Sequence, residues 1–385
     1  MIIFLFGCQN TSPILSNLSI PSQSLYLDDA FNNNISYVLE SEDEVFKLND
    51  KILAMLRSKT NHQQTAYQKS QIILKHLFNE EAISINYDGN ANFTANQTYQ
   101  SQSANCMSLT ILAYSLAVAA DLEVKIQAVQ VPEYWTYDKN FSVLTGHVNL
   151  IIKNQPRLYK RVVWGDKNTV IDFDPYIAKK KFPTKAIGKK TLLAMFYNNI
   201  GSQALINQNY SLAYQYFKGA TLADSKFSVA WGNLGILYKI TGHQHMAEMT
   251  YYEAVRIDPD NLTALNNLAR LFHKQERTEE ALLLEKHIHK IRKKNPYYHA
   301  LLANDAMFKK QYQVAIKHYR SAIRLDKKQH EFYFGLAVAY YQQNNVLLSY
   351  QAMEKALAFS TTQNSTQQYT AKLNLYDKSS VLFKP

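Results

Sequence analysis

The pattern of apolar and polar positions divides the chain into a mixed first half and a helical second half. Ser41-Glu-Asp-Glu44 has the form of a capping box and predicts a helix start, and a second helix is expected over 63–78. Short alternating runs at 124–131 and 145–152 predict strands. Helices followed by strands are typical of an α+β domain, here over 36–185.

From residue 194 to residue 363 the apolar pattern repeats with a 34-residue period. Trp231, Gly235 and Tyr238 in the second unit resemble the signature positions of the tetratricopeptide repeat. Such a unit is a helix pair that buries its apolar face only by stacking on its neighbours, so the resemblance implies an all-α solenoid. Residues 364–385 are expected to be a C-terminal tail. The five units are expected to start at 194, 228, 262, 296 and 330.

An apolar helix is expected to begin at Cys106, directly after a polar loop. Asn105 or Ser103 can cap this helix, which places Cys106 in its first turn. Unpaired N–H groups and the positive end of the helix dipole favour a thiolate at such a position. The alternative is a small buried cysteine without chemistry.

Two further residue types needed for thiol chemistry follow Cys106 along the chain. His147 lies on a predicted strand, and Asp172 ends another. A cysteine, a histidine and an aspartate on three elements match the roles of nucleophile, general base and group that orients the base. Asp174 lies two residues on and points the same way from a strand, so it remains an alternative to Asp172.

The motifs around these residues resemble a known family. Asn105-Cys106-Met-Ser-Leu, Gly146-His147-Val and Val170-Ile-Asp172-Phe are similar to the transglutaminase-like domain of the papain-like superfamily. The order of the two halves is similar to that of bacterial envelope proteins in which this domain precedes tetratricopeptide repeats. The resemblance implies an α+β papain/transglutaminase-like fold and a Cys–His–Asp site. It also implies an oxyanion role for Gln100, since papain-like proteases place a glutamine at this distance before the cysteine; a solvated loop amide is the alternative.

The composition narrows the possible partners. The net charge is +11, and much of the excess lies in 285–328. The basic residues are spread over several predicted helices without a nucleic-acid motif, so we expect a solvated surface and no nucleic acid. Thiol chemistry needs no metal or organic cofactor, and none is expected. The two cysteines, Cys8 and Cys106, are not expected to pair, because a disulfide would consume the nucleophile.

Leu5-Phe-Gly-Cys8 resembles a bacterial lipoprotein signal, with Cys8 as the lipidated residue. Residues 1–35 are therefore expected to be a signal remnant and a polar tether. The resemblance implies a lipid-anchored protein of the bacterial cell envelope that faces the periplasm. The alternative is a cytoplasmic chain with an apolar N-terminus.

The first helices of the repeats are expected to line a concave groove for a protein or peptide partner, in which Arg270 and Lys274 could bind a carboxylate. A solvated face is the alternative. The residues expected to face the groove are Asn266, Arg270, Lys274, Asn304 and Phe308.

Two functions follow from these motifs. One is thiol-dependent acyl transfer or amide hydrolysis at the envelope, with the repeats binding a partner. The other is a non-catalytic scaffold with an inactive transglutaminase-like domain.

Residues 176–193 are expected to be a linker. Apolar residues from Leu192 to Phe196 predict that the first repeat packs on the preceding domain.

Overall fold

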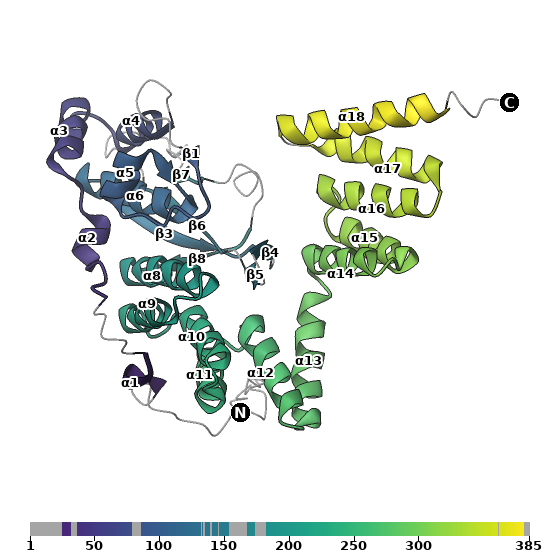
Figure 1. Ribbon diagram of the computed structural model, residues 1–385. Helices are drawn as coiled ribbons and strands as arrows, with labels where there is room; N and C mark the ends of the chain where they lie inside the picture. Colours follow the sequence, from purple (N-terminus) through teal and green to yellow (C-terminus); the bar gives the residue numbers. More distant parts are fainter. Residues whose placement is uncertain are drawn as a thin grey trace, which may run out of the picture. The chain divides into compact units, whose positions relative to one another are not determined.

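Helix pairs make up most of the chain that a computed structural model describes (Figure 1). The described residues are 25–31, 37–78, 86–131, 133, 135–138, 141–144, 146–153, 168–173, 182–360 and 362–380. The chain divides into two compact units. The first unit comprises residues up to Val129, His147–Asp174 and Thr184–Glu285, and the second comprises Gln130–Gly146, Pro175–Pro183 and Lys286–Pro385.

Helices precede and accompany a sheet in the first unit. Ser41 and Glu44 form the predicted capping box, in which the Ser41 hydroxyl accepts from the Glu44 N–H at 3.3 Å. A second capping box, formed by Thr94 and Gln97, starts a helix where we expected a loop. The sequence contains the signal for this capping box, a threonine followed three residues later by a glutamine. The helices are α2 (Glu42–Phe46), α3 (Asp50–Lys59), α4 (Ala66–Phe78), α5 (Ala95–Ser101) and α6 (Cys106–Ala119).

The sheet of the first unit has the strand order β7-β6-β3-β8, and every neighbouring pair is antiparallel. Its central strand β3 begins opposite the end of β6, with Val124 facing Ile152 and Val129 facing His147. The strand β8 pairs with the other edge of β3, so the expected linker over 176–193 is wrong in its last part. A short parallel pair, β1 with β2, lies outside this sheet. The bounds are β1 (Asn86–Tyr87), β2 (Ser103–Ala104), β3 (Val124–Val129), β6 (His147–Ile152), β7 (Thr169–Ile171) and β8 (Thr184–Ile187).

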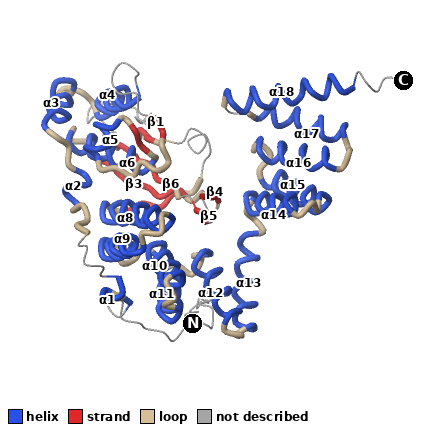
Figure 2. Tube along the Cα trace, viewed as in Figure 1, coloured by secondary structure: helices blue, strands red, loops and turns tan. Residues whose placement is uncertain are grey.

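The repeats have the predicted period, and the first helices of the second to fifth repeats begin at the predicted residues. The paired helices approach closely: a Cβ added to Gly235 would lie 2.5 Å from the Tyr251 ring, which explains the small residue there. Figure 2 shows helices throughout this part of the chain. The helices are α8 (Lys189–Ile206), α9 (Tyr210–Ala223), α10 (Ser228–Ile240), α11 (Gln244–Ile257), α12 (Leu262–Lys274), α13 (Thr278–Arg292), α14 (Pro296–Phe308), α15 (Tyr312–Leu325), α16 (His330–Gln342) and α17 (Val346–Phe359).

The first repeat packs on the preceding helices and sheet, as its apolar residues predict. Leu192 and Phe196 on α8 are fully buried in one core with Ile111 of α6 and Leu150 of β6. The first repeat and the sheet of the first unit therefore share a single apolar core.

The expected tether is wrong for residues 25–31. This segment contains the short helix α1 (Asp28–Phe31) and packs on the first two repeats, with Leu25 and Phe31 buried. The physical reason is that its apolar side chains find a groove between helices, although the surrounding sequence is polar.

The second unit holds a β-hairpin and the later repeats. The hairpin is formed by β4 (Trp135–Asp138) and β5 (Phe141–Leu144). The expected C-terminal tail is also wrong, because α18 (Gln363–Ser380) is a helix that buries Tyr369 and Leu373 against the last repeat. It covers the apolar face that the final helix pair presents.

Candidate functional site

The start of α6 carries the candidate nucleophile. Cys106 is the first residue of this helix and is partly exposed, while most of the helix behind it is buried. Asn105 caps the helix, since its side-chain oxygen accepts from the Ser108 N–H at 2.9 Å. Cys106 therefore lies at the end of the helix where N–H groups point outward.

The loop before α5 is held to the start of α6 by the capping residues themselves. The Asn105 amide donates to Asn92 Oδ1 at 2.8 Å, and the Ser108 hydroxyl donates to the Ala91 carbonyl at 2.6 Å. The Phe93 N–H in turn donates to the Ser108 hydroxyl at 2.8 Å. These buried and partly buried hydrogen bonds fix the surroundings of Cys106.

The sheet brings His147 and Asp172 together. His147 begins β6, and Asp172 follows β7, which pairs with β6 along the same edge. His147 Nε2 lies 2.8 Å from Asp172 Oδ1, and the two side chains are 3% and 5% exposed. A buried carboxylate at this distance can hold the orientation and tautomer of the imidazole. Of the two aspartates left open by the sequence, Asp172 pairs with His147, and Asp174 lies outside the described residues.

A third side chain on this edge was missed from the sequence. Asn149 donates from Nδ2 to Asp172 Oδ2 at 3.1 Å, so each carboxylate oxygen of Asp172 has a partner. Asn149 is two residues from His147 on the same strand, and alternation places both side chains on one face. That spacing was available in the sequence, but the carboxylate that Asn149 contacts depends on the pairing of β6 with β7.

Gln100 lies on α5 and is exposed, so it is part of a helix rather than the expected loop. Its oxyanion role stays a prediction.

Cys8, the expected lipid anchor, lies outside the described residues. Within the described ranges, no group of three or more His, Cys, Asp or Glu side chains is placed to hold a metal ion. Among the described helices, none has the length and apolar character that crossing a membrane requires.

The repeats of the first unit carry a basic cluster on two neighbouring first helices. Arg270 and Lys274 are exposed on α12, which fits the expected groove and its alternative, a solvated face, equally, and Asn266 is half-buried on the same helix. Burial lowers the pKa of Lys239 on α10, and the positive charges of Arg270 and Lys274 lower it further. Lys239 is therefore a third member of this cluster, which we missed because the close approach of α10 and α12 is not visible in the sequence. Three like charges in mutual range favour an anionic group between them.

The expected groove residues of the second unit lie on α14. Phe308 is 89% exposed. Asn304 is also exposed, and its side-chain oxygen accepts from the Tyr319 hydroxyl at 2.5 Å. Both side chains are accessible to a partner.

Two family models match the chain. One, described as tetratricopeptide repeat, matches residues 228–261, and another, described as TPR repeat, matches residues 307–344. The chain thus contains tetratricopeptide repeats, and the first of these matches starts at the predicted beginning of the second repeat. Among curated proteins, none matches this chain.

Solved structures of repeat proteins are similar to part of the chain. They include MamA (17% identity, 43% of this chain and 91% of that chain, TM-score 0.27). A structure titled for Pseudomonas aeruginosa pilF has 16% identity over 49% of this chain and 90% of that chain, with a TM-score of 0.30. YrrB, titled as a TPR protein with an unusual peptide-binding site, has 16% identity over 46% of this chain and 92% of that chain, with a TM-score of 0.25.

Proposed function

We propose that the repeats bind a protein or peptide partner, and that the face carrying the basic cluster of Lys239, Arg270 and Lys274 contributes to this binding. The observation that carries this proposal is the position of Arg270 and Lys274, which are exposed four residues apart on one face of α12, within electrostatic range of Lys239 on α10. A carboxylate, such as the end of a polypeptide chain, offsets their mutual repulsion, and Arg270 can bind it with two parallel hydrogen bonds.

The proposal can be tested with a library of synthetic peptides that end either in a free carboxylate or in an amide. We expect the protein to prefer free carboxylates, and Arg270→Glu to lower the affinity of the selected peptides at least tenfold. Lys226→Glu, an exposed charge reversal in the connection between α9 and α10, serves as the control. Equal binding of both peptide classes, or equal loss in the control, contradicts the proposal.

A second candidate function is thiol-dependent acyl chemistry in the first unit. It is favoured by the 2.8 Å contact between His147 and Asp172, in a region that also presents Cys106 at a helix start. The proposal also rests on the resemblance of the motifs around these residues to the transglutaminase-like domain. In this mechanism His147 removes the thiol proton, Cys106 attacks an amide carbonyl, and the imidazolium protonates the leaving amine. Water or another amine then resolves the thioester. The competing view is an inactive domain that serves the repeats as a platform.

Alkylation by iodoacetamide separates these two views without knowledge of the substrate. In a Cys8→Ser background only Cys106 can react. An activated thiol should react faster than a free cysteine at neutral pH, and His147→Ala should lower the rate at least tenfold. Asn149→Ala should lower it less, because Asn149 contacts Asp172 rather than His147. A parent protein that reacts no faster than free cysteine would falsify the thiol mechanism and leave the scaffold function.

We also propose that Cys8 carries a lipid that anchors the protein in the bacterial cell envelope, facing the periplasm. The proposal rests on the motif Leu5-Phe-Gly-Cys8. Mass spectrometry of the N-terminal peptide from native cells tests it, and an unmodified cysteine in that peptide contradicts it.

A further inference from the structure

The chain fills one groove of its own repeats with the segment Leu25–Phe31. The groove is formed by α9 and α10, and the ring of His243, the residue before α11, lies 5.8 Å from the Phe31 ring. Phe31 stacks on the Tyr214 ring of α9 with a centroid distance of 4.6 Å, and the Tyr238 hydroxyl of α10 donates to the Leu25 carbonyl at 2.8 Å. With Leu25 1% and Phe31 4% exposed, the two ends of the segment are anchored by apolar side chains.

The middle of this segment is held by contacts to the carboxylate of Asp28. Asp28 accepts hydrogen bonds from Lys218 Nζ at 2.6 Å and from the Tyr214 hydroxyl at 2.8 Å. Tyr26 stacks on Trp231 at a centroid distance of 5.9 Å, and its ring also lies 5.3 Å from Lys218 Nζ. The groove thus recognises a carboxylate between aromatic and aliphatic anchors.

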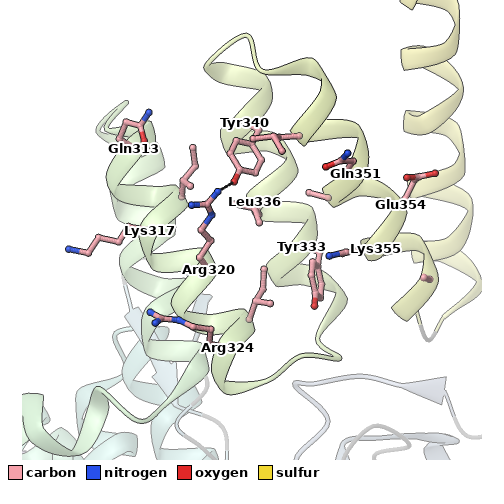
Figure 3. A pocket seen from close by; sticks show the side chains of 15 residues that line it. Gln313, Lys317, Arg320, Arg324, Tyr333, Leu336, Tyr340, Gln351, Glu354 and Lys355 are labelled. Carbon is pink, nitrogen blue, oxygen red and sulfur yellow. Dashed lines mark hydrogen bonds between the residues drawn. The ribbon is translucent and has the colours of Figure 1, made fainter.

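Three repeats further along the chain, the equivalent groove between α15 and α17 is an open cavity of about 1080 Å³ (Figure 3). The helices correspond residue for residue, because each repeat has the same 34-residue length. Arg320 stands at the position of Lys218, and Tyr340 at the position of Tyr238. The cavity is also lined by Ile316, Ile323 and Tyr333, which stand at the positions of Tyr214, Thr221 and Trp231.

The correspondence extends to a hydrogen bond at the base of each groove. Trp231 Nε1 donates to the Ser225 carbonyl at 3.0 Å, and the Tyr333 hydroxyl donates to the Lys327 carbonyl at 3.0 Å. Residues 225 and 327 also occupy equivalent positions in their repeats. The two grooves therefore share this hydrogen bond and the aromatic rings at two positions, Trp231 with Tyr333 and Tyr238 with Tyr340, while Ile316 replaces the ring of Tyr214.

The open groove is the more basic of the two. Lys317, Arg324 and Lys355 line it, at positions where the filled groove has Gln215, Leu222 and Glu253. Of the lining residues, Glu354 alone is acidic. Arg320 and the Tyr340 hydroxyl, 2.5 Å apart, point into the same space (Figure 3). Leu336 and Ala352 add buried apolar surface, so a small inorganic anion would leave much of the cavity unfilled.

We infer that the groove formed by α15, α16 and α17 binds an acidic peptide segment of a partner protein, with apolar or aromatic anchors on both sides of its carboxylates. The inference rests on the proposal that the repeats bind a partner. It adds a second binding surface on the repeats and the class of peptide sequence that this surface binds. The model for the bound peptide is the chain's own segment Leu-Tyr-Leu-Asp-Asp-Ala-Phe. Arg320 takes the role of Lys218 towards its carboxylate.

The probe is a fluorescein-labelled synthetic peptide with the sequence of residues 25–31, measured by fluorescence polarisation against the full-length protein. We expect saturable binding that Arg320→Glu weakens at least tenfold and Arg320→Lys largely preserves. A peptide with both aspartates replaced by asparagine should bind at least tenfold more weakly. Circular dichroism checks that the variants are folded.

Lys218→Glu is the matched control, because it reverses the equivalent charge in the filled groove. If this variant loses the peptide and Arg320→Glu keeps it, the probe has exchanged with the chain's own segment and the inference is wrong. Absence of binding overturns it as well. A dimer that depends on Arg320 and is dissolved by the peptide would identify the occupant as a second copy of the chain, and would overturn the assignment to a separate partner. Arg270-dependent binding of the peptide library is measured independently, so the proposed function can stand if this inference fails.

Discussion

The two ends of the repeat array are covered in different ways. In the first unit, α8 buries Leu192 and Phe196 in a core shared with α6 and the sheet. In the second unit, α17 is covered by one added helix, α18, through Tyr369 and Leu373. A helix pair buries its apolar face only against a neighbour, so each terminal pair needs a cover. The difference is that the first cover also carries the candidate site, while the second is a helix alone.

The largest expected effect is at the first end. Phe196 is fully buried, so Phe196→Ala should lower the free energy of unfolding of the first unit by about 3–5 kcal/mol. Hydrogen exchange measured by mass spectrometry should show the loss of protection in both α8 and α6, because they share one core. Lys190→Ala, an exposed position on the same helix, is the control. Loss confined to α8 would mean that the two parts do not support each other.

A smaller effect is expected at the second end. Leu373→Ala removes a side chain that is 9% exposed, and should cost about 2–3 kcal/mol locally. Leu375→Ala, two residues on and 64% exposed, should cost less than about 0.5 kcal/mol. Hydrogen exchange of α17 and α18 provides the measurement. Equal effects of the two changes would show that α18 does not act as a cover.

Within the array, the helix contact at Gly235 should resist a single added methyl group. Gly235→Ala places a Cβ against the fully buried ring of Tyr251, and should cost about 1–3 kcal/mol in urea unfolding. Gly89→Ala, with nothing within 4 Å of the added Cβ, is the control in the part before the repeats. An unchanged midpoint in the Gly235 variant would mean that the ring can move aside.

The smallest expected effect concerns the segment over the first two repeats. The hydrogen bond from Lys218 holds the pKa of Asp28 below its usual range. A lowered folded-state pKa stabilises the docked segment above the ordinary pKa, and this contribution is lost as the pH falls through the folded value. The Asp28 side chain is 60% exposed, so the contribution should stay below about 1 kcal/mol.

Acid release of this segment can be followed through Trp231 fluorescence, since Tyr26 stacks on that ring. We expect a change below about pH 4 that is absent in Asp28→Asn. A transition of the same size in the asparagine variant would assign it to another group.

Periodicity and local capping could be read from the sequence because both depend on residues close together in the chain. The repeat length, the helix starts from Ser228 to His330 and the capping box at Ser41 are of this kind. The order of Cys106, His147 and an aspartate also predicted that the histidine pairs with an aspartate, but the choice between Asp172 and Asp174 came from the structure. The resemblance to the transglutaminase-like domain also implies thiol chemistry at these residues, and that chemistry remains a proposal.

Only the tertiary structure decided what covers each exposed face. The segment 25–31, β8 and α18 were assigned from the sequence to a tether, a linker and a tail, because each is short or polar on average. Each is held by contacts outside its own residues: Leu25 and Phe31 are buried against the first two repeats, β8 pairs with β3, and α18 packs on the last repeat. The local pattern of apolar and polar residues indicates the propensity of a segment for helix or strand. Whether its apolar side chains become buried depends on whether another part of the fold leaves an apolar surface uncovered. For the same reason the roles of Asn149 and Lys239 could not be predicted from the sequence. They depend on the pairing of β6 with β7 and on the contact of α10 with α12.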